Sequence, residues 1–206
     1  MLTLAGFSKQ MVTIPRAEEP GLIRELPDEA LIRAIADGDR RALHALYLRH
    51  KVRTYRFVLR LTADAALAED IVSEVFLDVW RQAVGFKGKS RVSTWILAIA
   101  RYKALSALRR RSDEQLDDCT ATAIADPADD PGMMVERQDR SRIVRKCLSQ
   151  LSTTHREMLD LVYYQEKSVE EVAQIIGVPC GTVKTRMFYA RKHMEKLLET
   201  AGIDRH

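Results

Sequence analysis

The feature that most constrains this chain is a stretch near its middle, residues 113–135, which holds seven acidic side chains and no basic one. The same stretch contains two Asp-Pro steps, many small residues and no aromatic side chain. Such a segment cannot bury enough apolar surface to offset the entropy lost on ordering. We therefore expect a flexible acidic linker over 113–135, joining one module at 29–112 to a second at 136–206.

Both modules are basic, with a net charge of +9 over 29–112 and +3 over 136–206, against −7 over the linker. A field of this sign favours a polyanionic partner. A charged surface that only keeps the protein soluble is the alternative explanation. Residues 1–28 carry a net charge of −1 and are expected to form a mobile N-terminal extension, in which Met11 is a possible alternative start.

Several classes of protein are excluded by composition. The three cysteines are widely spaced, which fits neither a disulfide framework nor a metal site. The longest run without a charged side chain, residues 172–183, is shorter than the roughly 20 residues a membrane span needs. The residues offer neither the Ser, His and Asp order of a catalytic triad nor a glycine-rich phosphate-binding loop. We expect a cytoplasmic protein that is not an enzyme, needs no cofactor or metal and does not insert into membranes.

The apolar residues of the first module recur at helical spacing, and no strand-like alternation is present. The pattern predicts a short helix over 29–36 closed by Gly38, a long helix with Val52 among its core residues, and two further helices around 71–80 and 95–108. Asp39, Asp64 and Ser93 stand where helix N-caps are expected. We predict an all-α fold of two small helical domains.

The second module shows the signals of a helix-turn-helix. Two helices are predicted first, and the apolar side of the second is formed by Met158, Leu159, Leu161, Val162 and Tyr163. Ser168 and Glu171 then form a capping-box pattern before a short helix that ends at Gly177. A long helix follows to about Glu199, and the glycine provides the turn between the two.

The last helix has an apolar side and a basic, hydroxyl-rich side. Val183, Met187 and Ala190 fall on the apolar side, followed by Met194 and Leu197. The opposite side carries Thr182, Lys184, Thr185, Arg186, Tyr189, Arg191 and Lys192. Such side chains reach base edges and phosphates in the major groove. An ordinary solvated helix face is the alternative, but the preceding turn favours DNA binding.

The first module combines aromatic rings with cations between residues 86 and 110. The residues concerned are Phe86, Lys87, Lys89, Arg91, Trp95, Arg101, Lys103, Arg109 and Arg110. Aromatic faces stack on unpaired bases while cations follow phosphates, which is the chemistry of single-strand binding. Trp95 as a core residue, and the cations as solubilising charges, are the alternatives.

The helix before this segment carries an acidic stripe of Asp70, Glu74 and Asp78 at four-residue spacing, beside Phe76 and Trp80. From charge alone, a solvated helix face explains the stripe as well as a basic protein partner does.

Taken in order, four segments resemble a known family: AEDIVSEVFLDVWRQ, then TWILAIARYKALSALRRR, then the acidic linker, then SVEEVAQIIGVPCGTVKTRMFYARKHM. Together they are similar to bacterial sigma factors, and most of all to the two-module, extracytoplasmic-function class. The resemblance covers roughly residues 29–200.

The resemblance implies that core RNA polymerase and promoter DNA are partners, together with a cognate anti-sigma factor, and that the protein acts in a stress or envelope response. Asp70, Glu74 and Asp78, with Phe76 and Trp80 as framework, become the expected polymerase contacts. The segment from Phe86 to Arg110 would meet the melted downstream element, and Thr182 to Lys192 the upstream element.

The sequence departs from the common pattern at Tyr102-Lys103, Ser106 and Tyr189, which puts the promoter sequence in doubt. A helix-turn-helix repressor or response regulator with a helical sensor domain is the alternative function. Co-purification with polymerase would separate the two.

Overall fold

The structure, a computed structural model, describes residue 23, residues 25–114 and residues 135–202. Most of the predicted linker and residues 1–22 therefore lie outside the described residues. The first module contains α2 (Asp28–Ala36), α3 (Arg40–Thr62), α4 (Ala65–Gln82), the 3-10 turn η1 (Ala83–Gly85) and α5 (Val92–Glu114). The second contains α6 (Val135–Gln150), α7 (Thr153–Leu159), the π-helical turn η2 (Asp160–Tyr164), α8 (Val169–Ile176) and α9 (Cys180–Thr200).

The all-α prediction is confirmed, because every regular element in the described ranges is a helix or a helical turn. Within those same ranges, no helix combines the length and the apolar character that crossing a bilayer requires.

Two of the three predicted N-caps in the first module are confirmed. The Asp39 carboxylate accepts from the Arg41 amide at 2.8 Å, and the Asp64 carboxylate accepts from the Leu67 amide at 3.0 Å. The prediction for Ser93 is wrong, because α5 begins at Val92 and places Ser93 inside its first turn. The Ser93 hydroxyl instead accepts from Lys167 Nζ at 2.6 Å, a contact with the second module.

The core of the first module is built from one side of each helix, with Leu46, Phe57, Val75 and Ile96 almost fully buried. Val52, predicted as a core residue, is 47% exposed. Thr54, two residues farther along α3, faces the core instead. Its hydroxyl donates to the His50 carbonyl at 2.9 Å, so the buried polar group has a hydrogen-bond partner.

The packed fold begins earlier in the chain than the predicted boundary at residue 29. Ile23 is buried in the core. Asp28 accepts from Arg49 Nη1 at 2.5 Å and contacts His50 Nε2 at 2.7 Å. Partial burial acts to raise the pKa of Asp28, but His50 and Arg49 outweigh it and the pKa lies below its ordinary value. Asp28 therefore helps to hold the beginning of α2 against α3.

The predicted helix-turn-helix geometry is present in the second module. Ser168 and Glu171 form the complete capping box of α8. Gly177 ends α8 with φ of +75°, in the left-handed region that favours glycine. Val183, Met187 and Ala190 of α9 are buried, as the spacing predicts.

The prediction that Tyr163 lines the apolar side of its helix is wrong, since this ring is 58% exposed. Residues 160–164 form a π-helical turn in which the Gln165 amide donates to the carbonyl of Asp160, five residues back. The extra residue in the turn shifts the register, so that Tyr163 and Tyr164 point outward while Asp160 points inward.

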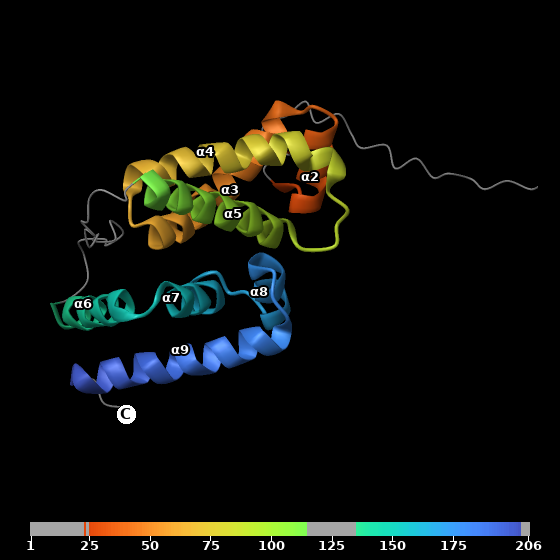
Figure 1. The fold of residues 1–206 in the computed structure, drawn as a ribbon. Helices are drawn as coiled ribbons and strands as arrows, with labels where there is room; N and C mark the ends of the chain where they lie inside the picture. Colours follow the sequence, from red (N-terminus) through yellow and green to blue (C-terminus); the bar gives the residue numbers. More distant parts are fainter. Residues whose placement is uncertain (1–22, 24, 115–134, 203–206) are drawn as a thin grey trace, which may run out of the picture.

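The two modules pack against each other. Helix α5 contacts α8, and α3 contacts α7, so that buried side chains of both modules form one continuous apolar cluster. In Figure 1, α7 and α8 lie on the side of the second module that faces the first, and α9 lies on the opposite side.

Candidate nucleic-acid and polymerase surfaces

The basic side of α9 is accessible to a partner. Five of its predicted contact residues are exposed: Lys184, Thr185, Tyr189, Arg191 and Lys192. Thr182 and Arg186 are half-buried. Because Val183, Met187 and Ala190 hold the opposite side in the core, α9 presents this face over its first three turns. The arrangement is suited to insertion into a major groove.

Aromatic side chains that the sequence analysis did not single out lie beside this face. Phe188 is 61% exposed, and the Arg191 guanidinium lies 5.7 Å from the centre of the Tyr163 ring. Phe188, Met187 and Val162 line a groove of about 710 Å³ whose rim is basic. The π-helical turn that exposes Tyr163 has no signal in the residue spacing, which explains the omission.

The loop before α5 joins aromatic support to exposed charge. The rings of Phe86 and Trp95 are 4.9 Å apart and both are half-buried. Lys87, Lys89 and Arg91 are exposed around them. Trp95 therefore combines a packing role with partial access. Lys87 and Lys89 are exposed toward a phosphate backbone, whereas Arg91 Nε lies 3.9 Å from Glu171 Oε1 of the second module.

Farther along α5, the predicted contact residues differ in their surroundings. Arg109 and Arg110 are exposed and line a cavity of about 480 Å³ together with Tyr102, which is 69% exposed. Arg101 is instead engaged by the second module, because its Nε donates to Glu157 Oε1 at 2.6 Å.

Lys103 connects two surfaces that the sequence analysis treated separately. Its Nζ lies 3.1 Å from Glu74 Oε2 and 2.9 Å from Asp78 Oδ2, so that a predicted DNA contact meets the predicted polymerase contacts of α4. Burial acts to lower the pKa of Lys103, but the two carboxylates outweigh burial and raise it. Lys103 is therefore held as a cation between α4 and α5.

The acidic stripe on α4 is accessible and rests on a rigid base. Asp70 and Glu74 are exposed, while Asp78 is half-buried. Phe76 is buried with its ring 5.0 Å from that of Tyr47, and Trp80 packs against the same core. The two aromatic residues thus have the framework position that the resemblance implies.

The stripe belongs to a longer exposed seam that the sequence analysis did not find. Asp70, Glu74, Leu77, Arg81 and Val84 are spaced alternately by four and three residues and are all exposed. Leu77 is 53% exposed and Val84 78%. A seam with this spacing is the pattern by which one helix packs along another. The signal was available in the sequence as two apolar residues, Leu77 of α4 and Val84 of η1, that the core does not use.

Two buried carboxylates were also missed. Glu157 and Asp160 are 6% and 3% exposed and face Arg101 and Arg60 of the first module. Burial raises the pKa of Asp160 to about 6, although the Arg60 guanidinium opposes the rise. Sequence alone gives an acidic residue no signal of burial when its partner lies far away along the chain.

Two families match this chain. Residues 46–114 match Sigma-70 region 2, and residues 141–194 match Sigma-70 region 4. The extracytoplasmic-function sigma factor SigK of Mycobacterium tuberculosis is 30% identical over 176 residues, which are 84% of this chain and 94% of the relative. SigL of the same species is 29% identical over 177 residues, 85% of this chain and 99% of the relative.

Solved structures agree with these matches. The sigma factor RpoE of Bartonella quintana, in complex with the anti-sigma factor NepR, aligns with a TM-score of 0.65 and 26% identity, covering 77% of this chain and 96% of that one. CnrH in complex with the cytosolic domain of CnrY aligns with a TM-score of 0.62, covering 84% of this chain and 97% of that one. At 22% identity, the second likeness concerns the fold.

Proposed function

This chain belongs to the extracytoplasmic-function family of RNA polymerase sigma factors, which direct polymerase to promoters, and we propose which of its surfaces carries each step. The exposed seam on α4 binds core polymerase. The loop before α5, together with α5 itself, holds the melted downstream element. The basic face of α9 enters the major groove of the upstream element. The protein acts in the cytoplasm as a regulatory subunit without catalytic activity of its own.

The observation that carries the polymerase assignment is the exposed seam of Asp70, Glu74, Leu77, Arg81 and Val84. Its apolar residues give a helical partner a surface to pack on, and its carboxylates favour a partner with basic side chains. The seam therefore favours a function in which a second protein is bound.

An anti-sigma factor is a further proposed partner. Support comes from the sigma factor RpoE of Bartonella quintana, which is in complex with the anti-sigma factor NepR in its solved structure. The stress or envelope response is proposed on the same footing, as a feature of the class.

The polymerase assignment is tested by reversing charge on the seam. We expect Asp70→Lys with Glu74→Lys to reduce binding to core polymerase by several kcal/mol, because like charges would then face each other, about 3 kcal/mol being a hundredfold in affinity. Pull-down with core polymerase measures the effect. The matched control is Asp37→Lys with Glu199→Lys, which makes the same change of net charge at two exposed positions off the seam. Equal binding by both double variants would refute the assignment.

The α9 assignment predicts two kinds of DNA contact. If Arg186 reads a base edge, Arg186→Ala relaxes specificity at one position by about 1–3 kcal/mol. If Lys184 contacts phosphate alone, Lys184→Ala weakens all promoters alike and lowers the salt slope by about one unit. Selection from a promoter library, repeated at two salt concentrations, separates the two. Sequence-independent losses in both variants would contradict base reading by Arg186.

A further inference from the structure

The surface of the first module that faces the second overlaps the surface that is proposed to hold single-stranded DNA, at Arg91 and Arg101. Ser93, Thr94 and Arg101 of α5 all bond to side chains of the second module. Thr94 is only 1% exposed as a result. Three contacts, each between residues more than 50 positions apart in the chain, thus involve the same helix, α5.

Arg101 is held in the way that an arginine holds a phosphate. Its Nε and Nη2 donate to the two carboxylate oxygens of Glu157 at 2.6 and 3.3 Å, and its Nη1 donates to the Ile176 carbonyl at 3.5 Å. A two-pronged contact of this kind uses the planar fork that guanidinium offers to carboxylates and phosphates alike. Glu157 therefore occupies the place that a nucleic-acid phosphate would need.

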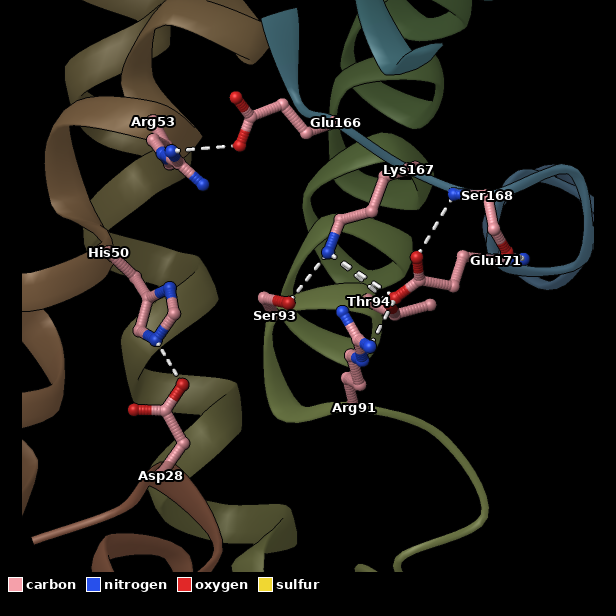
Figure 2. A network of polar contacts seen from close by, with 10 residues as sticks. All are labelled: Asp28, His50, Arg53, Arg91, Ser93, Thr94, Glu166, Lys167, Ser168 and Glu171. Atoms are coloured by element: carbon pink, nitrogen blue, oxygen red, sulfur yellow. Dashed lines mark hydrogen bonds and ion pairs between the residues drawn. The ribbon is translucent and has the colours of Figure 1, made fainter.

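A second cluster fastens the beginning of α5 (Figure 2). Glu171 Oε1 accepts from the Thr94 hydroxyl at 2.8 Å, and Lys167 Nζ donates to the Ser93 hydroxyl at 2.6 Å. Burial acts to raise the pKa of Glu171, but hydrogen bonds from Ser168 and Thr94 outweigh it and the pKa lies below its ordinary value. The carboxylate is thus stabilised in its charged form at the contact between the modules.

The third contact joins α3 to η2. The Arg60 guanidinium forms an ion pair with Asp160 and lies 4.7 Å from the centre of the Tyr164 ring. Together, the three contacts direct carboxylates from the second module onto hydroxyls and guanidinium groups of the first. The second module thus presents to α5 the same acceptor groups that a DNA backbone would present.

We infer that the second module is an internal ligand of the first: in the free protein it closes over α5 and withholds Arg101 and the beginning of that helix from single-stranded DNA. This inference rests on the proposed single-strand role of α5. Binding of the melted strand requires the modules to separate, because Arg101 cannot hold Glu157 and a phosphate at once. Closure therefore reduces the apparent affinity for single strands to the intrinsic affinity multiplied by the fraction of molecules that are open.

Closure treats the two DNA-binding surfaces differently, which makes the inference testable. The face of α9 formed by Lys184, Thr185, Tyr189, Arg191 and Lys192 is exposed in the closed arrangement. Helix α9 lies on the side of the second module opposite α5 (Figure 1). Opening the modules must therefore increase binding to single strands and leave binding to duplex DNA unchanged.

The experiment uses the full chain with Glu157→Arg, which places like charges opposite Arg101. Small-angle X-ray scattering reports separation of the modules. Fluorescence anisotropy measures binding to a short random-sequence DNA pool, once as single strands and once as duplex. We expect a larger radius of gyration and single-strand binding tighter by about tenfold or more, with duplex binding unaltered. Glu199→Arg, the same change of net charge at an exposed position of α9, controls for non-specific attraction.

Two further variants complete the test. The charge swap Arg101→Glu with Glu157→Arg restores an opposite-charge pair and is expected to be compact again, even if Glu157→Arg alone fails to fold. Arg101→Ala breaks the contact with Glu157 but also removes the guanidinium, so it is expected to separate the modules without the gain in single-strand binding.

The outcomes distinguish closure of the modules from the proposed single-strand role of α5. Compact scattering by Glu157→Arg, an expanded charge-swap variant, or single-strand binding no tighter than that of Glu199→Arg would overturn the closure. No single-strand binding by any variant, open or closed, would instead refute the single-strand role of α5.

Discussion

Helices α5 and α9 are both long, both basic and both proposed to bind DNA, yet their surroundings differ. The basic face of α9 is exposed along its first half, whereas Arg101 of α5 is held by Glu157 of the other module. A basic helical face in a sequence therefore indicates that a polyanion can bind there. It does not indicate whether another part of the same protein already covers that face. Charge reversal, pH and truncation can each test the comparison.

The largest effect is expected from reversing one charge on each helix. Arg101→Glu brings two carboxylates together at the contact between the modules. It is expected to lower the free energy of unfolding by up to about 3 kcal/mol, since opening of the modules returns both charges to water and limits the loss. Lys184→Glu makes the same change at an exposed site of α9 and should alter it by no more than about 0.5 kcal/mol. Urea denaturation followed by circular dichroism measures both. Similar losses in the two variants would abolish the distinction drawn here.

A second effect concerns the buried carboxyl of Asp160. Because its pKa in the folded protein is about 6, against an ordinary 3.8, its favourable contribution to stability is complete below pH 3.8 and is lost as pH rises through 6. Asp160→Asn stays neutral throughout. We expect this variant to be more stable than the parent by about 1–3 kcal/mol above pH 7, and the difference to vanish near pH 4.

Asp64 supplies the control of opposite sign for this measurement. A hydrogen bond from the Leu67 amide, aided by Arg111, holds the pKa of Asp64 below its ordinary value. Its contribution is therefore present above pH 3.8 and is lost as pH falls through the folded-state pKa. Urea titrations between pH 2 and pH 8 distinguish the two carboxyls, because the Asp64 contribution changes only below pH 3.8 and the Asp160 contribution above it. A constant difference between the parent and Asp160→Asn across that range would show that Asp160 is not strained by burial.

The smallest effect separates local from long-range contacts at α8. Ser168→Ala removes one capping hydrogen bond and should cost about 1 kcal/mol. Glu171→Ala removes its part of the capping box and also the acceptor for Thr94, so its cost should be about 2 kcal/mol. Equal thermal denaturation midpoints for the two variants would mean that the Thr94 contact adds nothing.

The local structure follows from residue spacing and capping signals alone. Helical spacing located α4, α5 and α9, Asp39 and Asp64 marked the beginnings of α3 and α4, and Gly177 marked the turn of the helix-turn-helix. These signals work because a helix repeats every 3.6 residues and because caps and turns involve neighbours within a few positions. The same periodicity distinguished the apolar side of α9 from its basic side.

Which helix faces are covered depends instead on how the two modules pack together. Ser93 was predicted as a cap and instead meets Lys167, 74 residues away. Glu171 was predicted correctly as half of a capping box, yet its second oxygen holds Thr94 of the other module. Burial of Asp160, which the π-helical turn points inward, depends on Arg60 lying opposite it. Local spacing carries no information about such partners, because two segments far apart in the chain meet only when their apolar faces pack together.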